Sequence, residues 1–94
     1  MSIADALLRK NLTIALPCGQ RVVLRRPSAL DFIEAAEMAT KEPARLRAFL
    51  AHRHVLGEDG QPALPTLQAA LEADGRLIWE IGAECEKLYE EGRD

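Results

Sequence analysis

The chain of 94 residues has few aromatic side chains, and this limits how its core can be built. Only Phe32, Phe49, Trp79 and Tyr89 are aromatic, although 48% of the residues are hydrophobic. A core must therefore come mainly from Leu, Ile, Val and Ala. At this length we expect one hydrophobic core and a single domain over residues 1–94.

The sequence also lacks long hydrophobic runs. No stretch reaches the roughly 18 consecutive apolar residues that a membrane span requires. The segment from Met1 to Lys10 places its basic residues after the apolar ones, the reverse of a secretory signal peptide. We therefore expect a protein that stays in the cytoplasm in which it is made and that has no membrane partner.

Cysteine is scarce, since the chain has only Cys18 and Cys85. A cytoplasm keeps cysteines reduced, so a pair of this kind seldom forms a disulfide there. The surrounding patterns place Cys18 at a turn and Cys85 inside a helix. We therefore expect two free thiols.

Motifs for catalysis, metals or cofactors are missing as well. His52 and His54 stand two residues apart, and on a helix this separates their directions by about 200°, so they cannot share one ion. Neither histidine belongs to a motif with a nucleophile, and no dinucleotide-binding or P-loop spacing occurs. We expect ordinary surface histidines, no metal, no cofactor and no enzymatic activity.

The stretch over residues 12–26 has the pattern of a β-hairpin. Leu12, Ile14 and Leu16 alternate with the smaller Thr13 and Ala15, and the returning segment places Val22 and Leu24 on one face, with Arg21, Val23 and Arg25 on the other. Between them, Pro17-Cys18-Gly19 offers a proline for a type I turn and a glycine for a position with positive φ. Val23 is expected on the outer face of this hairpin.

Residues 28–91 have helical patterns. Ser28 and Asp31 form a capping-box pair for a helix over residues 29–40, and Pro43 begins a second helix that ends near residue 55. A loop over residues 56–65, a short helix capped by Thr66 and a long helix over residues 75–91 follow. The core-facing residues expected on the first and last of these helices are Phe32, Ile33, Ala36 and Ala39, and Leu77, Ile78, Ile81, Cys85 and Leu88.

These elements predict an α+β fold in which an N-terminal β-hairpin packs on a small bundle of three to four α-helices. Residues 1–11 precede the hairpin as an N-terminal arm with a short helix, which is marginal in water unless its apolar face docks. Trp79 lies beside the apolar stripe of the last helix. It is either a core residue, which the small size of the domain favours, or an exposed interface anchor.

Charge is unevenly distributed around a net value of -3. Residues 1–30 carry five basic and one acidic side chain, whereas residues 61–94 carry three basic and eight acidic ones. Arg21, Arg25 and Arg26 form a basic group that could contact nucleic acid. No aromatic residue stands among them to stack on bases, and the whole chain is acidic, so we favour a solvated surface or a protein contact.

The segment from Leu16 to Asp31 resembles the opening of the tail assembly chaperones of long-tailed bacteriophages and prophages. The shared order is an apolar strand, a Leu-Pro-x-Gly turn, the run Val-x-Leu-Arg-Arg-Pro and an acidic helix start. The resemblance covers about a fifth of the chain. Family members often have a basic residue directly after the turn glycine, where this chain has Gln20.

The resemblance implies a phage tail assembly chaperone without enzymatic activity in the host cell cytoplasm. Such a protein binds the tape-measure protein, with tail-tube subunits as a further candidate partner, keeps it soluble during tail assembly and is absent from the virion. We also expect self-association into an oligomer. The alternative is a small DNA-binding regulator that uses the basic group. The candidate partner-binding residues are Ile3, Leu7, Val23, Arg25, Arg26 and Trp79.

Overall fold

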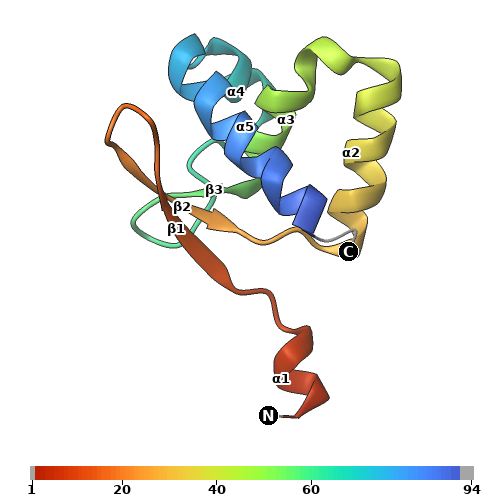
Figure 1. Ribbon diagram of the computed structural model, residues 1–94. Helices are drawn as coiled ribbons and strands as arrows, with labels where there is room; N and C mark the ends of the chain where they lie inside the picture. The colour runs from red at the N-terminus through yellow and green to blue at the C-terminus, as the bar shows by residue number, and fades with distance from the viewer. Residues whose placement is uncertain (1, 92–94) are drawn as a thin grey trace.

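The computed structural model describes residues 2–91 of the chain. Met1 of the predicted arm and residues 92–94 of the predicted domain lie outside the described residues. Five α-helices and a three-stranded antiparallel sheet make a mixed α+β fold, which confirms the predicted class (Figure 1). Within residues 2–91, no helix is both long enough and apolar enough to cross a membrane. In chain order the elements are α1 (Ile3–Leu7), β1 (Asn11–Ala15), β2 (Arg21–Arg25), α2 (Ala29–Lys41), the 3-10 turn η1 (Pro43–Arg45), α3 (Leu46–His54), β3 (Val55–Leu56), α4 (Leu67–Glu72) and α5 (Gly75–Glu91).

The predicted hairpin is present and is formed by β1 and β2. Leu12 lies opposite Leu24 in the antiparallel register. The turn closes because the Gly19 N–H donates to the Leu16 carbonyl over 2.8 Å, and the Leu16 N–H donates to the Gln20 carbonyl over 2.8 Å. Gly19 has a φ of +92°, in the left-handed region, as the sequence pattern predicted for this glycine.

A third strand, β3, was not predicted, because residue 55 was assigned to a helix and residue 56 to a loop. Val55 pairs with Leu24 and Leu56 pairs with Val23, so β2 is the central strand. A two-residue strand has no periodic pattern of its own, and only its pairing with β2 defines it. Val23 consequently lies half-buried beside Leu56, which makes it less available to a partner than expected.

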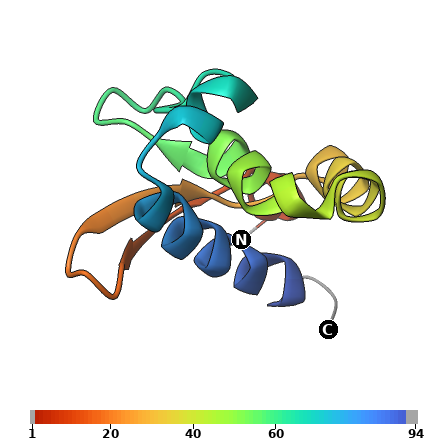
Figure 2. The ribbon, with the colours of Figure 1, turned by 90° about the horizontal axis from the view of Figure 1, so that it is seen from above.

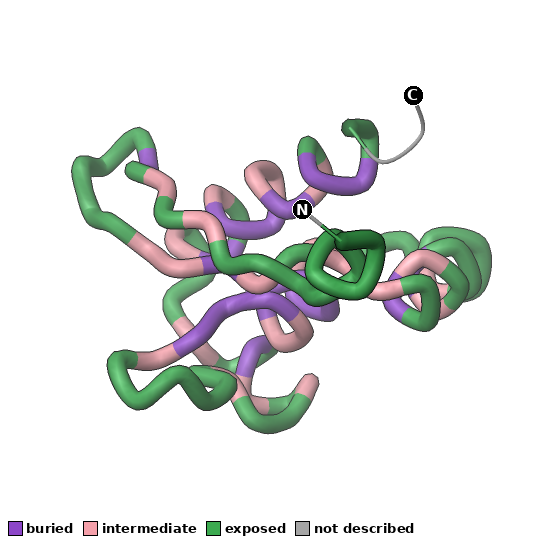
Figure 3. Tube along the Cα trace, turned by 90° about the horizontal axis from the view of Figure 1, so that it is seen from below, coloured by how far each residue is buried: buried purple, intermediate pink, exposed green. Residues whose placement is uncertain are grey.

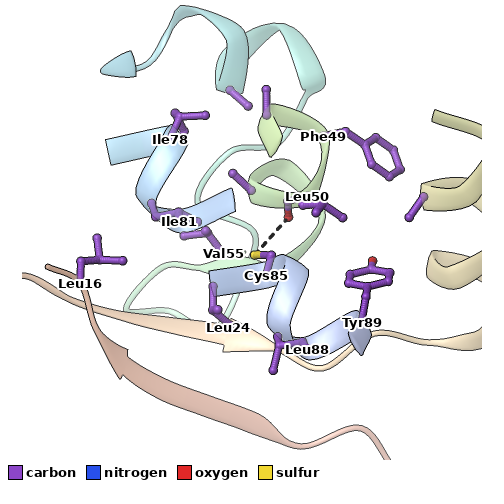
Figure 4. Packing of buried hydrophobic residues seen from close by; sticks show 14 residues of the cluster. Leu16, Leu24, Phe49, Leu50, Val55, Ile78, Ile81, Cys85, Leu88 and Tyr89 are labelled. Atoms are coloured by element: carbon purple, nitrogen blue, oxygen red, sulfur yellow. Dashed lines mark hydrogen bonds between the residues drawn. The ribbon is translucent and has the colours of Figure 1, made fainter. Parts of the chain in front are cut away.

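The core lies between the sheet and the helices α3 and α5, which cover one face of the sheet (Figures 1 and 2). Leu24 of β2, Leu50 of α3 and Cys85 of α5 are almost completely buried there. The Cys85 thiol points at the Leu50 carbonyl, with 3.9 Å between sulfur and oxygen (Figure 4). The predicted stripe of the last helix is confirmed at its four buried positions, which are Ile78, Ile81, Cys85 and Leu88.

Helix α2 begins and ends within one residue of the predicted bounds, but the prediction of its apolar face is only partly correct. Ile33, expected in the core, is 58% exposed, whereas Asp31 and Ala35 are the buried residues. The reason is an ion pair between Asp31 and Arg53 of α3, with 3.2 Å between oxygen and nitrogen. This contact turns the side that carries Asp31 and Ala35 toward α3.

Helix α1 stands apart from the other helices, at the far end of β1 (Figure 1). None of its residues is buried, and its whole turn is exposed in the view from below (Figure 3). The Asp5 N–H donates to the Ser2 hydroxyl over 3.3 Å, so the predicted cap of this short helix is present. Helix α1 therefore has no residue packed into the interior of its own chain.

We expect Ser28→Ala to destabilise the protein by about 1 kcal/mol, the usual value for loss of a helix N-cap. The Asp31 N–H donates to the Ser28 hydroxyl over 3.2 Å, and the Ser28 N–H donates to the Asp31 carboxylate over 2.9 Å. Urea unfolding measures the change. Ser2→Ala is the matched control, and it should leave the midpoint of the single chain unchanged because the helix that it caps has no buried residue in that chain. Equal effects of the two substitutions would contradict the assignment of Ser28 as the N-cap of α2.

Candidate protein-binding surface

An open groove lies between α2, α3 and the C-terminal half of α5. Its volume is about 200 Å³. The Phe32 and Tyr89 rings meet edge to face within it, with 5.0 Å between their centroids. The groove is lined by apolar side chains of α2 and α3, and by Tyr89 and two carboxylates of α5. The lining residues are Phe32, Ala35, Ala36, Ala39, Leu46, Leu50, Glu86, Tyr89 and Glu90.

The floor of the groove depends on a close approach of α3 and α5 at Gly82. A Cβ atom placed on Gly82 would lie 2.8 Å from the Cα atom of Arg47, closer than real side chains come. Only glycine allows the two helix backbones this separation. The absence of a side chain at Gly82 thus sets how near α5 lies to Leu46 and Leu50.

The exposed surface continues from the groove to Trp79. The Arg47 guanidinium lies 4.2 Å from the centroid of the Trp79 ring, and its Nε lies 3.2 Å from a carboxylate oxygen of Glu86. Trp79 and Glu86 are seven residues apart, about two helical turns, so they lie on one face of α5. We call the groove residues together with Arg47 and Trp79 the groove surface.

Trp79 is 60% exposed, so the core position favoured for it from the sequence is wrong. The face of α5 that packs on the sheet is occupied by Ile81, Cys85 and Leu88. Trp79 points away from that face because each residue turns the helix by about 100°. Its exposed ring agrees with the other alternative, an interface anchor.

Asp31 is the centre of a buried polar cluster beside the groove. Besides Ser28 and Arg53, it binds Arg9 of the arm, with 3.4 Å between nitrogen and oxygen. Burial alone would raise the pKa of Asp31, but the hydrogen bonds with Ser28 and the charge of Arg53 outweigh it and lower that pKa. Arg53 also pairs with Glu34, so the cluster links the arm, α2 and α3.

His54 is completely buried, so the expectation of a surface histidine is wrong for it. Its Nδ1 lies 2.8 Å from the Arg25 carbonyl, and its Nε2 lies 2.6 Å from the Tyr89 hydroxyl. A carbonyl can only accept, so Nδ1 carries the hydrogen and the Tyr89 hydroxyl donates to Nε2. Burial lowers the pKa of His54, and the nearby Asp31 carboxylate only partly opposes this. The neutral ring therefore joins the sheet to α5.

A signal for the burial of His54 was present in the sequence. Leu46, Leu50 and His54 are spaced by four residues and fall on one helical face. His52 lies off this face and is half-buried, with its Nδ1 2.7 Å from the Leu64 carbonyl. His52 and His54 are two residues apart and point in different directions from the helix, which is why they could not share a metal ion. For the same reason, one lies in the interior and the other at the periphery.

The basic group lies on a different part of the molecule from the groove surface. Arg21 and Arg26 are exposed, whereas Arg25 is half-buried and its Nε has no hydrogen-bond partner among the described residues. Arg21, Val23 and Arg25 share the outer face of β2, by the alternation of a strand. The candidate residues therefore divide into three places: the sheet, the arm with Ile3 and Leu7, and α5 with Trp79.

Between Ser2 and Glu91, no group of three or more His, Cys, Asp or Glu side chains lies close enough to hold a metal ion. Comparison of the chain with protein-family models, curated protein sequences and solved structures found no match. A proposal for the function therefore rests on the residues of this chain.

Proposed function

We propose that this protein is a tail assembly chaperone of a long-tailed phage or prophage, which binds the tape-measure protein in the host cytoplasm. Tail-tube subunits are a further candidate partner. Two features support the proposal: the resemblance over residues 16–31, and the groove surface with its apolar floor and exposed Trp79. The groove surface carries most of the argument, because a chaperone of this kind must present apolar area to its client.

The groove suits an amphipathic helix. Phe32, Ala36 and Ala39 follow one another at helical spacing along its α2 wall, and the two alanines let a second backbone approach closely. Glu90 at the α5 wall, which is in no ion pair among the described residues, can pair with lysine or arginine on the flank of such a helix. A helical client with an apolar stripe and basic flanks would thus be recognised along its length.

The proposed mechanism is masking by reversible binding. The apolar stripe of the tape-measure protein would otherwise aggregate in water, because exposed apolar patches associate. Covering the stripe in the groove keeps the client soluble, and tail-tube subunits then displace the chaperone as the tail assembles. Binding alone accomplishes this, and the protein leaves before the virion is complete.

Co-expression with the tape-measure protein of the same phage or prophage tests the proposal. The wild-type chain should keep that client in the soluble fraction. Trp79→Ala should weaken binding roughly 10-fold, a typical loss for an aromatic anchor at an interface. Leu30→Ala is the matched control, because Leu30 is an exposed apolar residue of α2 outside the groove and should leave solubility unchanged.

Equal aggregation of the client with and without this protein, at several ratios, would reject the chaperone function. A complex with DNA that weakens steeply with salt would support the regulator instead. In that case Arg21→Ala and Arg26→Ala, at the two exposed arginines, should weaken the complex while Trp79→Ala should not.

A further inference from the structure

The arm has apolar side chains but no surface of its own chain to cover them. Ile3 and Leu7 are each 75% exposed and Leu8 is 69% exposed. A helix of five residues is far too short to be stable alone in water, where roughly 12 to 15 residues are marginal. To be stable, the single turn of α1 therefore needs an apolar contact outside its own chain.

The path of the chain directs the arm away from its own groove. Leu8 is extended, with φ of −74° and ψ of 135°, and this breaks the helix before the hairpin. Arg9 then fixes the base of the arm to Asp31, next to Phe32 at one end of the groove. Figure 1 shows α1 pointing away from α2, α3 and α5. The base of the arm thus lies near the groove while its apolar residues lie outside it.

The arm and the groove match in spacing and in charge. Ile3 and Leu7 are four residues apart, about 6 Å along a helix, and so are Phe32 and Ala36 on the groove wall. Lys10 follows the apolar residues of the arm and Glu90 lines the groove, and neither takes part in an ion pair among the described residues. An arm seated in a groove would bring the opposite charges to the same region.

We propose that two copies of this chain exchange their arms, so that Ile3, Leu7 and Leu8 of each copy fill the groove of the other. The exchange is reciprocal, and a twofold dimer buries two arms at once. The base of each arm already lies at the end of a groove, so a small separation between the copies suffices. This inference concerns the chain alone and holds whether or not the protein is a chaperone. A client helix that uses the groove must displace the arm.

Light scattering on the full chain, without any client, tests the exchange. The wild type should have twice the mass of one 10.4 kDa chain and should dissociate on dilution. Leu7→Glu places a charge in the apolar contact, and Ala36→Lys fills the groove and pairs with its carboxylates. Each should raise the dimer dissociation constant roughly 10-fold or more. Leu71→Glu, at an exposed position on α4 outside the groove, should leave it unchanged.

Mixing the two monomeric variants gives the decisive measurement. The Ala36→Lys chain retains its arm and the Leu7→Glu chain retains its groove, so one native contact forms and the new Glu and Lys side chains meet in the other. The mixture should therefore dimerise although neither variant does so alone. A wild type that is monomeric at all concentrations, a dimer that both variants leave intact, or a mixture that stays monomeric would overturn the exchange. Circular dichroism on each variant establishes that its fold is retained.

Discussion

Gly82→Ala is expected to destabilise the protein by about 2 kcal/mol, although alanine is the better helix former. The added Cβ would lie 2.8 Å from the Arg47 Cα, so α3 and α5 would have to move apart. Overpacking of this kind costs about 3 kcal/mol when backbone must shift, and the gain in helix propensity returns at most about 1 kcal/mol. Urea unfolding at neutral pH measures the net change.

Gly75→Ala is the matched control for this substitution. Gly75 begins the same helix, and a Cβ there would have no atom within 4 Å. Its unfolding midpoint should stay the same or rise slightly. If Gly82→Ala also left the midpoint unchanged, then α3 and α5 would not approach each other as closely as described.

His54→Leu is expected to cost about 3 kcal/mol. The substitution keeps most of the volume of the side chain but leaves the Arg25 carbonyl and the Tyr89 hydroxyl without their partners in the interior. Each buried polar group left unpaired costs about 1 to 3 kcal/mol. Tyr89→Phe, which removes only the hydroxyl, should cost less, because only Nε2 then lacks a partner. Equal stability of His54→Leu and wild type would contradict the hydrogen-bond assignment.

The same histidine should make the stability depend on pH. Burial lowers the pKa of His54 in the folded protein, and the positive charges of Arg25 and Arg9 act in the same direction, while Asp31 opposes them. As the pH falls through about 6.5, the histidine of the unfolded chain is therefore protonated first, and the free energy of unfolding decreases. Stability should be fully present above about pH 6.5 and should decline below it. His54→Leu should remove this decline between pH 7 and pH 5.

The hairpin and the helix caps could be predicted from the sequence because their signals are local. Gly19 at a turn and Ser28 three residues before Asp31 each specify their structure within a few residues. The strand β3 could not be predicted in this way, since Leu56 becomes part of a strand only through Val23, which lies far away in the chain.

The groove surface was predicted only at one residue, Trp79. Phe32 and Ala36 were assigned to the core because helical spacing identifies an apolar face without showing whether another element covers it. That face is open because Asp31 binds Arg53 and sets the rotation of α2 on α3. The burial of an acidic residue is opposite to its usual preference, so periodicity alone could not reveal it.

The two cysteines lie in opposite environments, so the labelling of their thiols can report how often the fold opens. Cys18 is exposed at the hairpin turn, whereas burial raises the pKa of the Cys85 thiol to about 12. Only a thiolate attacks an alkylating reagent, so the folded chain should carry one label and the unfolded chain two. The rate at which the second label appears in native buffer would therefore measure how often α5 separates from the sheet. Intact-mass spectrometry would read this rate without any engineered probe.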